Sequence, residues 1–159
     1  MKTTIACFVL FLLPFFTFAQ NKAVDDLFNK YANKEGFTTV DLNGGLLQLA
    51  SMFDDDKDSK DLVKSMNHLR ILTMDGDSGS RINFYKELMT ELPVQEYKEL
   101  MTVKEKDQDV KFLVKESGGK ITELLMIVGG SDNALISITG NIDPKDLAQV
   151  SHMVKDVHN

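Results

Sequence analysis

One short segment has residue types that could carry out nucleophilic catalysis. Gly76-Asp77-Ser78-Gly79 spells the sequence around the reactive serine of trypsin-like proteases. That chemistry also needs a histidine base, an orienting aspartate and an oxyanion hole on a larger two-barrel scaffold. His68 lies ten positions upstream of Ser78 and in no matching context. Because turns prefer Gly, Asp and Ser, we interpret the segment as a turn between a strand and a helix.

Two aspartate-rich segments, residues 54–58 and 75–79, begin like a calcium-binding EF-hand loop. Such a loop also needs Gly at its sixth position and a bidentate Glu at its twelfth. The residues at these two positions are Ser59 and Ser65 for the first segment, and Ser80 and Lys86 for the second. We therefore expect no EF hand. The simplest interpretation of residues 54–58 is a solvated loop before a helix. A weak, adventitious calcium site is the alternative.

The remaining ligand and nucleophile types are scarce. The chain has one cysteine, Cys7, and three histidines, His68, His152 and His158. A structural zinc site needs four such ligands, and only the three histidines lie outside the N-terminal apolar segment that contains Cys7. A disulfide needs a second cysteine. No nucleophile–base pair is evident either. The sequence therefore predicts a protein that is not an enzyme and that carries no cofactor or metal.

The first nineteen residues have the pattern of a secretory signal peptide. Lys2 supplies a positive start, residues 5–18 are apolar except for Thr17, and Ala19 precedes the predicted cleavage point. Cys7 is too early in the apolar run to be the acylated residue of a lipoprotein. We therefore expect an exported protein, periplasmic or extracellular, with no membrane span after cleavage of residues 1–19.

The remaining chain, residues 20–159, has 140 residues, which suits a single domain. Without Lys2 it carries 17 basic and 24 acidic residues, a formal charge of −7. An acidic surface without a basic patch argues against a nucleic-acid partner.

Apolar periodicity and turn residues predict the elements of this domain. Helices are expected at residues 24–34, 46–53 (apolar at 46, 49, 50 and 53), 59–68, 81–92 and 144–157. Strands are expected at residues 37–42, 69–74, 97–103, 109–116, 121–128 and 134–139. The last four strands form a meander, and the two earlier ones are expected to join the same sheet. The fold class is therefore α+β: two layers, with a mainly antiparallel sheet and helices packed on one face.

The order of these segments resembles a secreted bacterial family, the domain of unknown function 4252, found mostly in Bacteroidota. The matching segments are residues 28–31, 37–40, 69–72, 97–101, 110–112, 123–127 and 138–143. The resemblance implies an exported domain and brings no activity, ligand or catalytic residues. Many members look like lipoproteins, and the position of Cys7 departs from that pattern.

Strand 121–128 is apolar on both faces, which raises the question of what covers the second one. Leu124, Met126 and Val128 alternate with Leu125 and Ile127. We expect Leu113 and Leu135 to join the face of Leu124 from the neighbouring strands, as a possible interaction face. The alternative is that a helix or the N-terminal segment covers this face, or that the strand is central and buried.

Two kinds of function follow from this pattern. The leading hypothesis is an exported, non-enzymatic envelope domain that acts by protein–protein association, with an unknown partner or with itself. The alternative is a carrier of a small ligand or lipid, with a pocket between the helices and the sheet.

Overall fold

The computed structural model describes residues 21–53, 56–75 and 82–146. The described helices are α1 (Lys22–Tyr31), α2 (Gly44–Met52), α3 (Lys57–Ser65) and α4 (Phe84–Glu91), with two 3-10 turns, η1 (Val94–Glu96) and η2 (Pro144–Asp146). The strands are β1 (Phe37–Asn43), β2 (Met66–Met74), β3 (Lys98–Lys104), β4 (Gln108–Ser117), β5 (Lys120–Gly130) and β6 (Ala134–Ile142).

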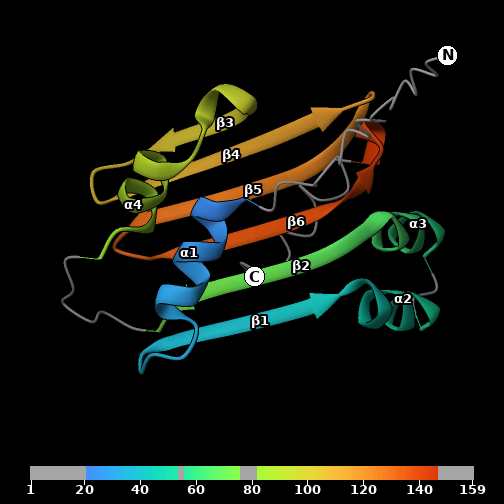
Figure 1. The fold of residues 1–159 in the computed structure, drawn as a ribbon, viewed down its shortest axis with the longest axis horizontal. Helices are drawn as coiled ribbons and strands as arrows, with labels where there is room; N and C mark the ends of the chain where they lie inside the picture. Colours follow the sequence, from blue (N-terminus) through green and yellow to red (C-terminus); the bar gives the residue numbers. More distant parts are fainter. Residues whose placement is uncertain (1–20, 54–55, 76–81, 147–159) are drawn as a thin grey trace, which may run out of the picture.

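All six strands form one antiparallel sheet in the order β1-β2-β6-β5-β4-β3 (Figure 1). The last four strands are a meander, and β2 and β1 extend the sheet beyond β6. The β4–β5 hairpin turns at Gly118 and Gly119, whose φ angles of 59° and 75° favour glycine. The predicted α+β class, with an antiparallel sheet and with helices (α1 and α4) packed on one face, is confirmed.

Helices α1 and α4 lie next to each other on one face of the sheet (Figure 1). α1 begins at its N-cap Asn21, and its apolar residues Val24, Leu27, Phe28 and Tyr31 are buried. They pack with Phe84 and Leu88 of α4 and with inward side chains of the central strands to form a first cluster; its strand residues are Leu72, Leu113, Leu125, Ile127 and Leu135.

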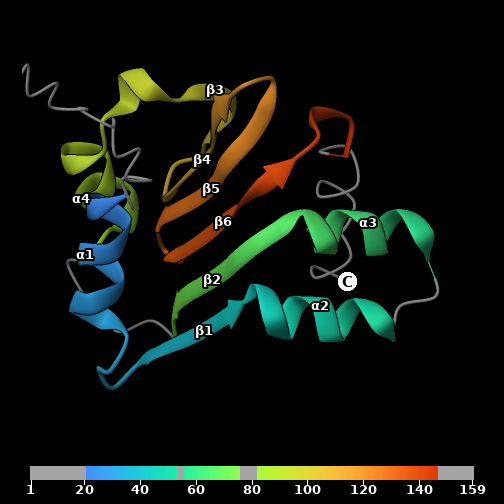
Figure 2. The ribbon, with the colours of Figure 1, turned by 45° about the vertical axis from the view of Figure 1, so that its right-hand side comes forward.

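Helices α2 and α3 connect β1 to β2 and extend beyond the ends of these two strands (Figure 2). The side chain of Asn43, the last residue of β1, accepts a hydrogen bond from the N–H of Leu46 and caps α2. Asp56 caps α3 in the same way. One leucine of each helix, Leu47 and Leu62, packs in a second cluster with strand residues that include Val114, Ile121, Leu124 and Ile138.

Several predicted boundaries were wrong, and two of them have a clear local cause. The helix expected to reach residue 68 ends at Ser65, because His68 and Leu69 pair with Asn43 and Leu42 of β1 and thus extend β2. α4 begins at Phe84, not residue 81, because the side chain of Asn83 accepts a hydrogen bond from the N–H of Lys86.

Several predicted segments lie outside the described residues. They are the signal peptide (residues 1–19), part of the first aspartate run (54 and 55), the turn with Ser78 (76–81) and the C-terminal helix beyond η2 (147–157).

A buried asparagine joins three parts of the chain. Asn133, in the β5–β6 turn, is only 2% exposed. Its Oδ1 accepts a hydrogen bond of 2.8 Å from the N–H of Phe84, the first residue of α4. Its Nδ2 donates to the carbonyl of Ile82 at 3.2 Å, and its own carbonyl accepts from the N–H of Met74 at the end of β2. The side chain therefore fixes where α4 meets the sheet.

Replacing Asn133 with Ala is expected to destabilise the domain by about 2–3 kcal/mol, because the buried N–H of Phe84 and carbonyl of Ile82 lose their partner. Urea denaturation followed by circular dichroism measures the change. Asn141→Ala, at an exposed position of β6, is the matched control and is expected to change stability by less than about 0.5 kcal/mol. Equal stabilities of the two variants would contradict this role for Asn133.

Candidate functional site

Two of the five residues predicted for the interaction face, Leu113 and Leu135, lie on the opposite face of the sheet from the others. Leu113 of β4 pairs with Leu125 and Leu135 of β6 pairs with Ile127, so both face α1 and α4 and belong to the first cluster. The strand partners of Leu124 and Met126 are instead Val114 and Phe112 of β4, and Ile138 and Ile136 of β6. We call the sheet face that carries Leu124, Met126 and Val128 the outer face.

For Leu113 the reason is a bulge in β5, where Thr122 is the extra residue. Next to the turn, Ser117 pairs with Lys120 and Glu116 with Ile121, but the register shifts by one residue between Lys115 and Glu116. A one-residue shift moves every side chain beyond it to the other face. Leu113 therefore lies beside Leu125 instead of Leu124.

The outer face is covered at one end. Leu124 is 4% exposed because it packs in the second cluster with Leu47 and Leu62 of α2 and α3. Val128 is 6% exposed, whereas Met126 is partly exposed. For Leu124, the alternative that helices cover the face is therefore correct.

Exposed apolar side chains continue this face at the edge of the sheet. β3 is an edge strand, and its Met101 and Val103 pair with Phe112 and Val110 of β4. Leu100, at a bulge in β3, is 51% exposed, and Met101 is 46% exposed. We call Leu100, Met101 and Val103 the β3 patch. An edge strand also has backbone N–H and C=O groups without strand partners, which can pair with another chain.

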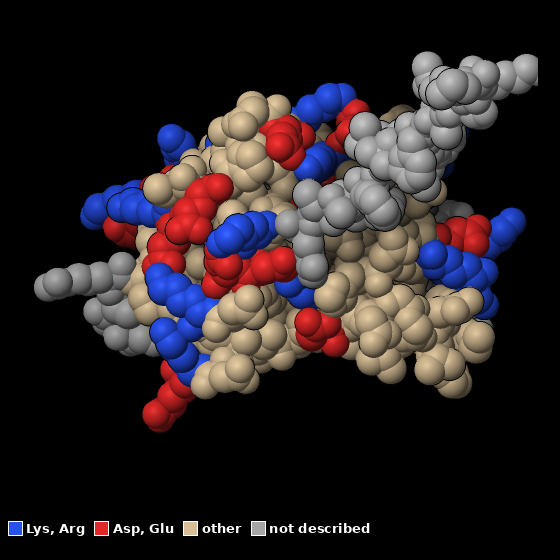
Figure 3. Space-filling view, in the orientation of Figure 1, with Lys and Arg blue, Asp and Glu red and all other residues tan. Residues whose placement is uncertain are grey.

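A second exposed apolar surface lies on α2. The predicted helix is present, but its buried residues are Leu47 and Ser51. The apolar positions predicted from the spacing, 46, 49, 50 and 53, are exposed instead. Leu46, Leu49, Met52 and the C-cap residue Phe53 are 49%, 54%, 62% and 88% exposed. We call these four residues the α2 stripe. Figure 3 shows the uncharged surface over α2, beside the mixed charges over α1 and α4.

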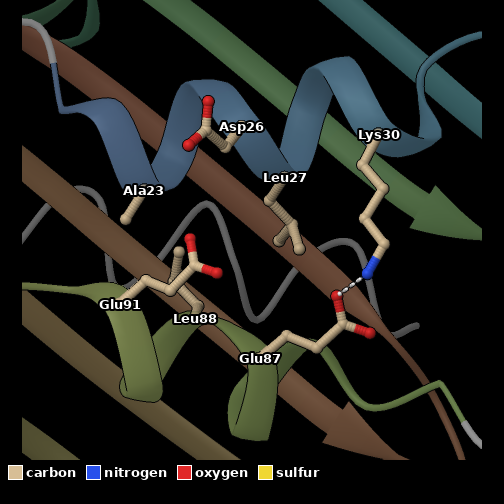
Figure 4. Close-up of a pocket in the computed structure, with 7 residues that line it drawn as sticks. All are labelled: Ala23, Asp26, Leu27, Lys30, Glu87, Leu88 and Glu91. Atoms are coloured by element: carbon tan, nitrogen blue, oxygen red, sulfur yellow. Dashed lines mark hydrogen bonds and ion pairs between the residues drawn. The ribbon is translucent and has the colours of Figure 1, made fainter.

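The alternative function as a carrier needs a pocket between helices and sheet. A shallow hollow of about 60 Å³ lies between α1 and α4, lined by Ala23, Leu27 and Leu88 and by four charged residues (Figure 4). Lys30 Nζ lies 2.8 Å from Glu87 Oε2 across its mouth, and Tyr31 donates to the same carboxylate. Pockets for drug-sized ligands have about 300–1,000 Å³, so this hollow does not support the carrier hypothesis.

A polar cluster at the amino end of α1 was not predicted from the sequence. The Tyr97 hydroxyl donates to Glu123 Oε2 at 2.6 Å, and Asn21 Nδ2 donates to both groups. Glu123 is buried in the sheet. Burial, together with the hydrogen bond to Glu123, raises the pKa of Tyr97 above its ordinary value. The cluster thus holds the amino end of α1 on the sheet. Because its pKa is raised, the Tyr97 hydroxyl keeps its proton and remains a donor.

An arginine whose side chain is only 11% exposed lies farther along the same face. Arg70 Nη1 donates to Asp25 Oδ1 of α1 at 2.7 Å, and its guanidinium lies 4.6 Å from the ring centre of Phe28. Its Nε and the hydroxyl of Ser137, its register partner on β6, are buried without a hydrogen-bond partner. Arg70 therefore ties α1 to β2 by charge and by stacking.

Residue types that can bind a metal do not form a cluster within the described part of the chain. His68 Nε2 lies 2.5 Å from Asp41 Oδ1 across β1 and β2. Among the described residues, no group of three or more His, Cys, Asp or Glu side chains is arranged to hold a metal ion. None of the described helices is long and apolar enough to cross a membrane.

Comparison with known families gives one match. The model described as Domain of unknown function (DUF4252) matches residues 31–150. Neither the curated proteins nor the solved structures give a match.

The two ends of the outer face are expected to respond differently to a charge. Leu124→Asp places a carboxylate under α2 and α3, at a cost of about 3–5 kcal/mol, which is a large part of the 5–15 kcal/mol that stabilises a typical domain. Met101→Asp, on the exposed edge, is expected to leave the melting transition cooperative and nearly unshifted. A folded Leu124→Asp protein would contradict the packing of Leu124 beneath α2 and α3. Circular dichroism during heating distinguishes the outcomes.

Tyr97→Phe is expected to lower stability by about 1 kcal/mol near neutral pH, because Glu123 loses a hydrogen-bond donor. The raised pKa of Tyr97 sets the sign of the pH dependence. Above about pH 10, tyrosines of the unfolded chain lose their protons, while the folded chain keeps the Tyr97 proton. Wild-type stability therefore falls relative to that of the variant as the pH rises past 10. Urea denaturation of both proteins near pH 7 and pH 11 measures the difference, and a constant difference would contradict burial of this hydroxyl.

Proposed function

The chain belongs to the DUF4252 family, and we propose that it is an exported, non-enzymatic domain that binds another protein through the β3 patch. Export is inferred from the signal-peptide pattern of residues 1–19. The absence of a nucleophile–base pair from the sequence supports a role in binding rather than catalysis.

The exposure of the β3 patch is the observation that carries this proposal. Three large apolar side chains, Leu100, Met101 and Val103, are exposed on one edge strand. Strands at the edge of a sheet bind extended segments of other proteins through backbone hydrogen bonds, and neighbouring side chains supply specificity. Phe112 and Met126 extend the apolar surface from this edge onto the outer face.

Charged residues frame the patch and favour a specific partner over nonspecific aggregation. Lys98 and Lys104 stand at the two ends of β3, and Glu99 pairs with Lys111 at 2.9 Å. Lysines and a bulge on an edge strand oppose uncontrolled pairing between copies. An incoming strand must therefore match this charge pattern as well as the apolar side chains.

Capture from the native envelope, with the tagged chain expressed from residue 20, tests the proposal. Leu100→Asp is expected to reduce recovery of a captured partner by about tenfold or more, equivalent to about 1.4 kcal/mol, because a carboxylate in an apolar contact loses its hydration. Val40→Asp, at an exposed apolar residue of the opposite edge strand β1, is the control and is expected to keep the partner. Recovery that is unaffected by Leu100→Asp would refute a binding site at β3.

A further inference from the structure

The α2 stripe is a second surface that needs an explanation, and it is separate from the β3 patch. The stripe lies beyond β1, while β3 is the opposite edge of the sheet (Figure 1). Residues 43–53 include no charged residue, in a chain of which 26% is charged. Four large apolar side chains of this segment are about half exposed or more.

We propose that two copies of this chain pair through the α2 stripe, with the two α2 helices antiparallel about a twofold axis. This pairing goes beyond the proposed binding of another protein at β3. Each copy supplies the same surface, as symmetric dimers require.

The area of the stripe fits a small dimer interface. If a free large apolar residue exposes about 200 Å², the exposed fractions of these four residues leave roughly 500 Å² of surface on each copy. Two copies then bury about 1,000 Å², which is near the lower limit for a specific interface. The dimer is therefore expected to dissociate on dilution.

The absence of charge explains how an acidic protein can pair with itself. The chain carries a formal charge of −6, so two copies repel each other over most of their surfaces. The stripe brings no like charges together, and interface cores are depleted of charged residues in general.

The helix dipole favours the antiparallel arrangement. α2 runs from Gly44 to Met52, with partial positive charge at its amino end and partial negative charge at its carboxyl end. Antiparallel helices bring opposite ends of the two dipoles together, whereas parallel helices place like ends side by side.

A lipid surface fits the stripe less well. Helices that bind membranes usually carry lysine or arginine and often tryptophan around their apolar face. Residues 43–53 contain none of these, and the adjacent aspartates are repelled by anionic lipids.

Sedimentation analysis of the chain from residue 20 tests the pairing at protein concentrations from about 1 μM to about 1 mM. The wild type is expected to change from monomer to dimer across this range. Leu49→Asp is expected to stay monomeric, and Leu100→Asp, its match in residue type and exposure, is expected to dimerise like the wild type. Circular dichroism checks that both variants are folded.

Single cysteines test the orientation, because residues 20–159 contain no natural cysteine. Antiparallel pairing places the middle of α2 against itself, so Ala50→Cys is expected to form a disulfide-linked dimer on mild oxidation. Leu46→Cys and Phe53→Cys are expected to cross-link efficiently when mixed and poorly when oxidised separately. Leu100→Cys is the control for random collisions.

Each contrary outcome overturns the proposal. A wild type that is monomeric at every concentration excludes the dimer. A dimer that survives Leu49→Asp but is lost in Leu100→Asp places the interface at β3, and efficient cross-linking of Leu46→Cys alone means that the helices are parallel. Flotation of a monomeric wild type with phosphatidylcholine vesicles, lost in Phe53→Asp, would assign the stripe to lipid. None of these results depends on capture of a partner at β3, so the two proposals can fail independently.

Discussion

The arrangement of this domain depends on the need to bury both faces of β5. Leu125 and Ile127 point to one side of this strand, while Ile121 and Leu124 pack in a separate cluster with residues of the other side. A strand with apolar residues on both faces is stable only in the interior of a sheet that is covered on both sides. β4 and β6 therefore flank it, α1 and α4 cover Leu125 and Ile127, and Leu47 and Leu62 reach the second cluster from the α2–α3 hairpin. The polar contacts of Asn133 and Glu123 then fix the helices in place on this strand.

The sequence was sufficient to identify the strands, but it did not show on which face of the sheet every side chain lies. Alternation and turn residues located all six strands and their single antiparallel sheet. They could not reveal the bulge at Thr122 of β5, opposite Lys115 and Glu116, because the extra residue leaves no mark in the alternation of Leu124, Met126 and Val128. That one residue decides whether Leu113 meets Leu124 or Leu125. A prediction of which residues share a face across a hairpin therefore requires the register as well as the pattern.

The sequence also did not show which side of α2 would be buried. Helical spacing correctly indicated that positions 46, 49, 50 and 53 share a side of the helix. Periodicity does not say whether that side meets the core of its own chain. Because α2 follows β1 directly and extends past the end of the strand, only Leu47 and Ser51 come to lie against the domain. The polar cluster of Asn21, Tyr97 and Glu123 was equally invisible, since its members are separated by up to 102 positions.

The two exposed apolar surfaces complement each other in a way that a single binding surface would not. α2 and β3 belong to opposite edges of the sheet, so a dimer joined through the α2 stripes leaves both β3 patches open. A partner with two recognition segments, or one present in many copies on a surface, would then bind the dimer more tightly than either patch binds alone, because the second contact forms within the complex. Such a gain requires no large interface at either site. It fits a domain whose exposed apolar area is divided between two small patches, each too limited for tight binding by itself.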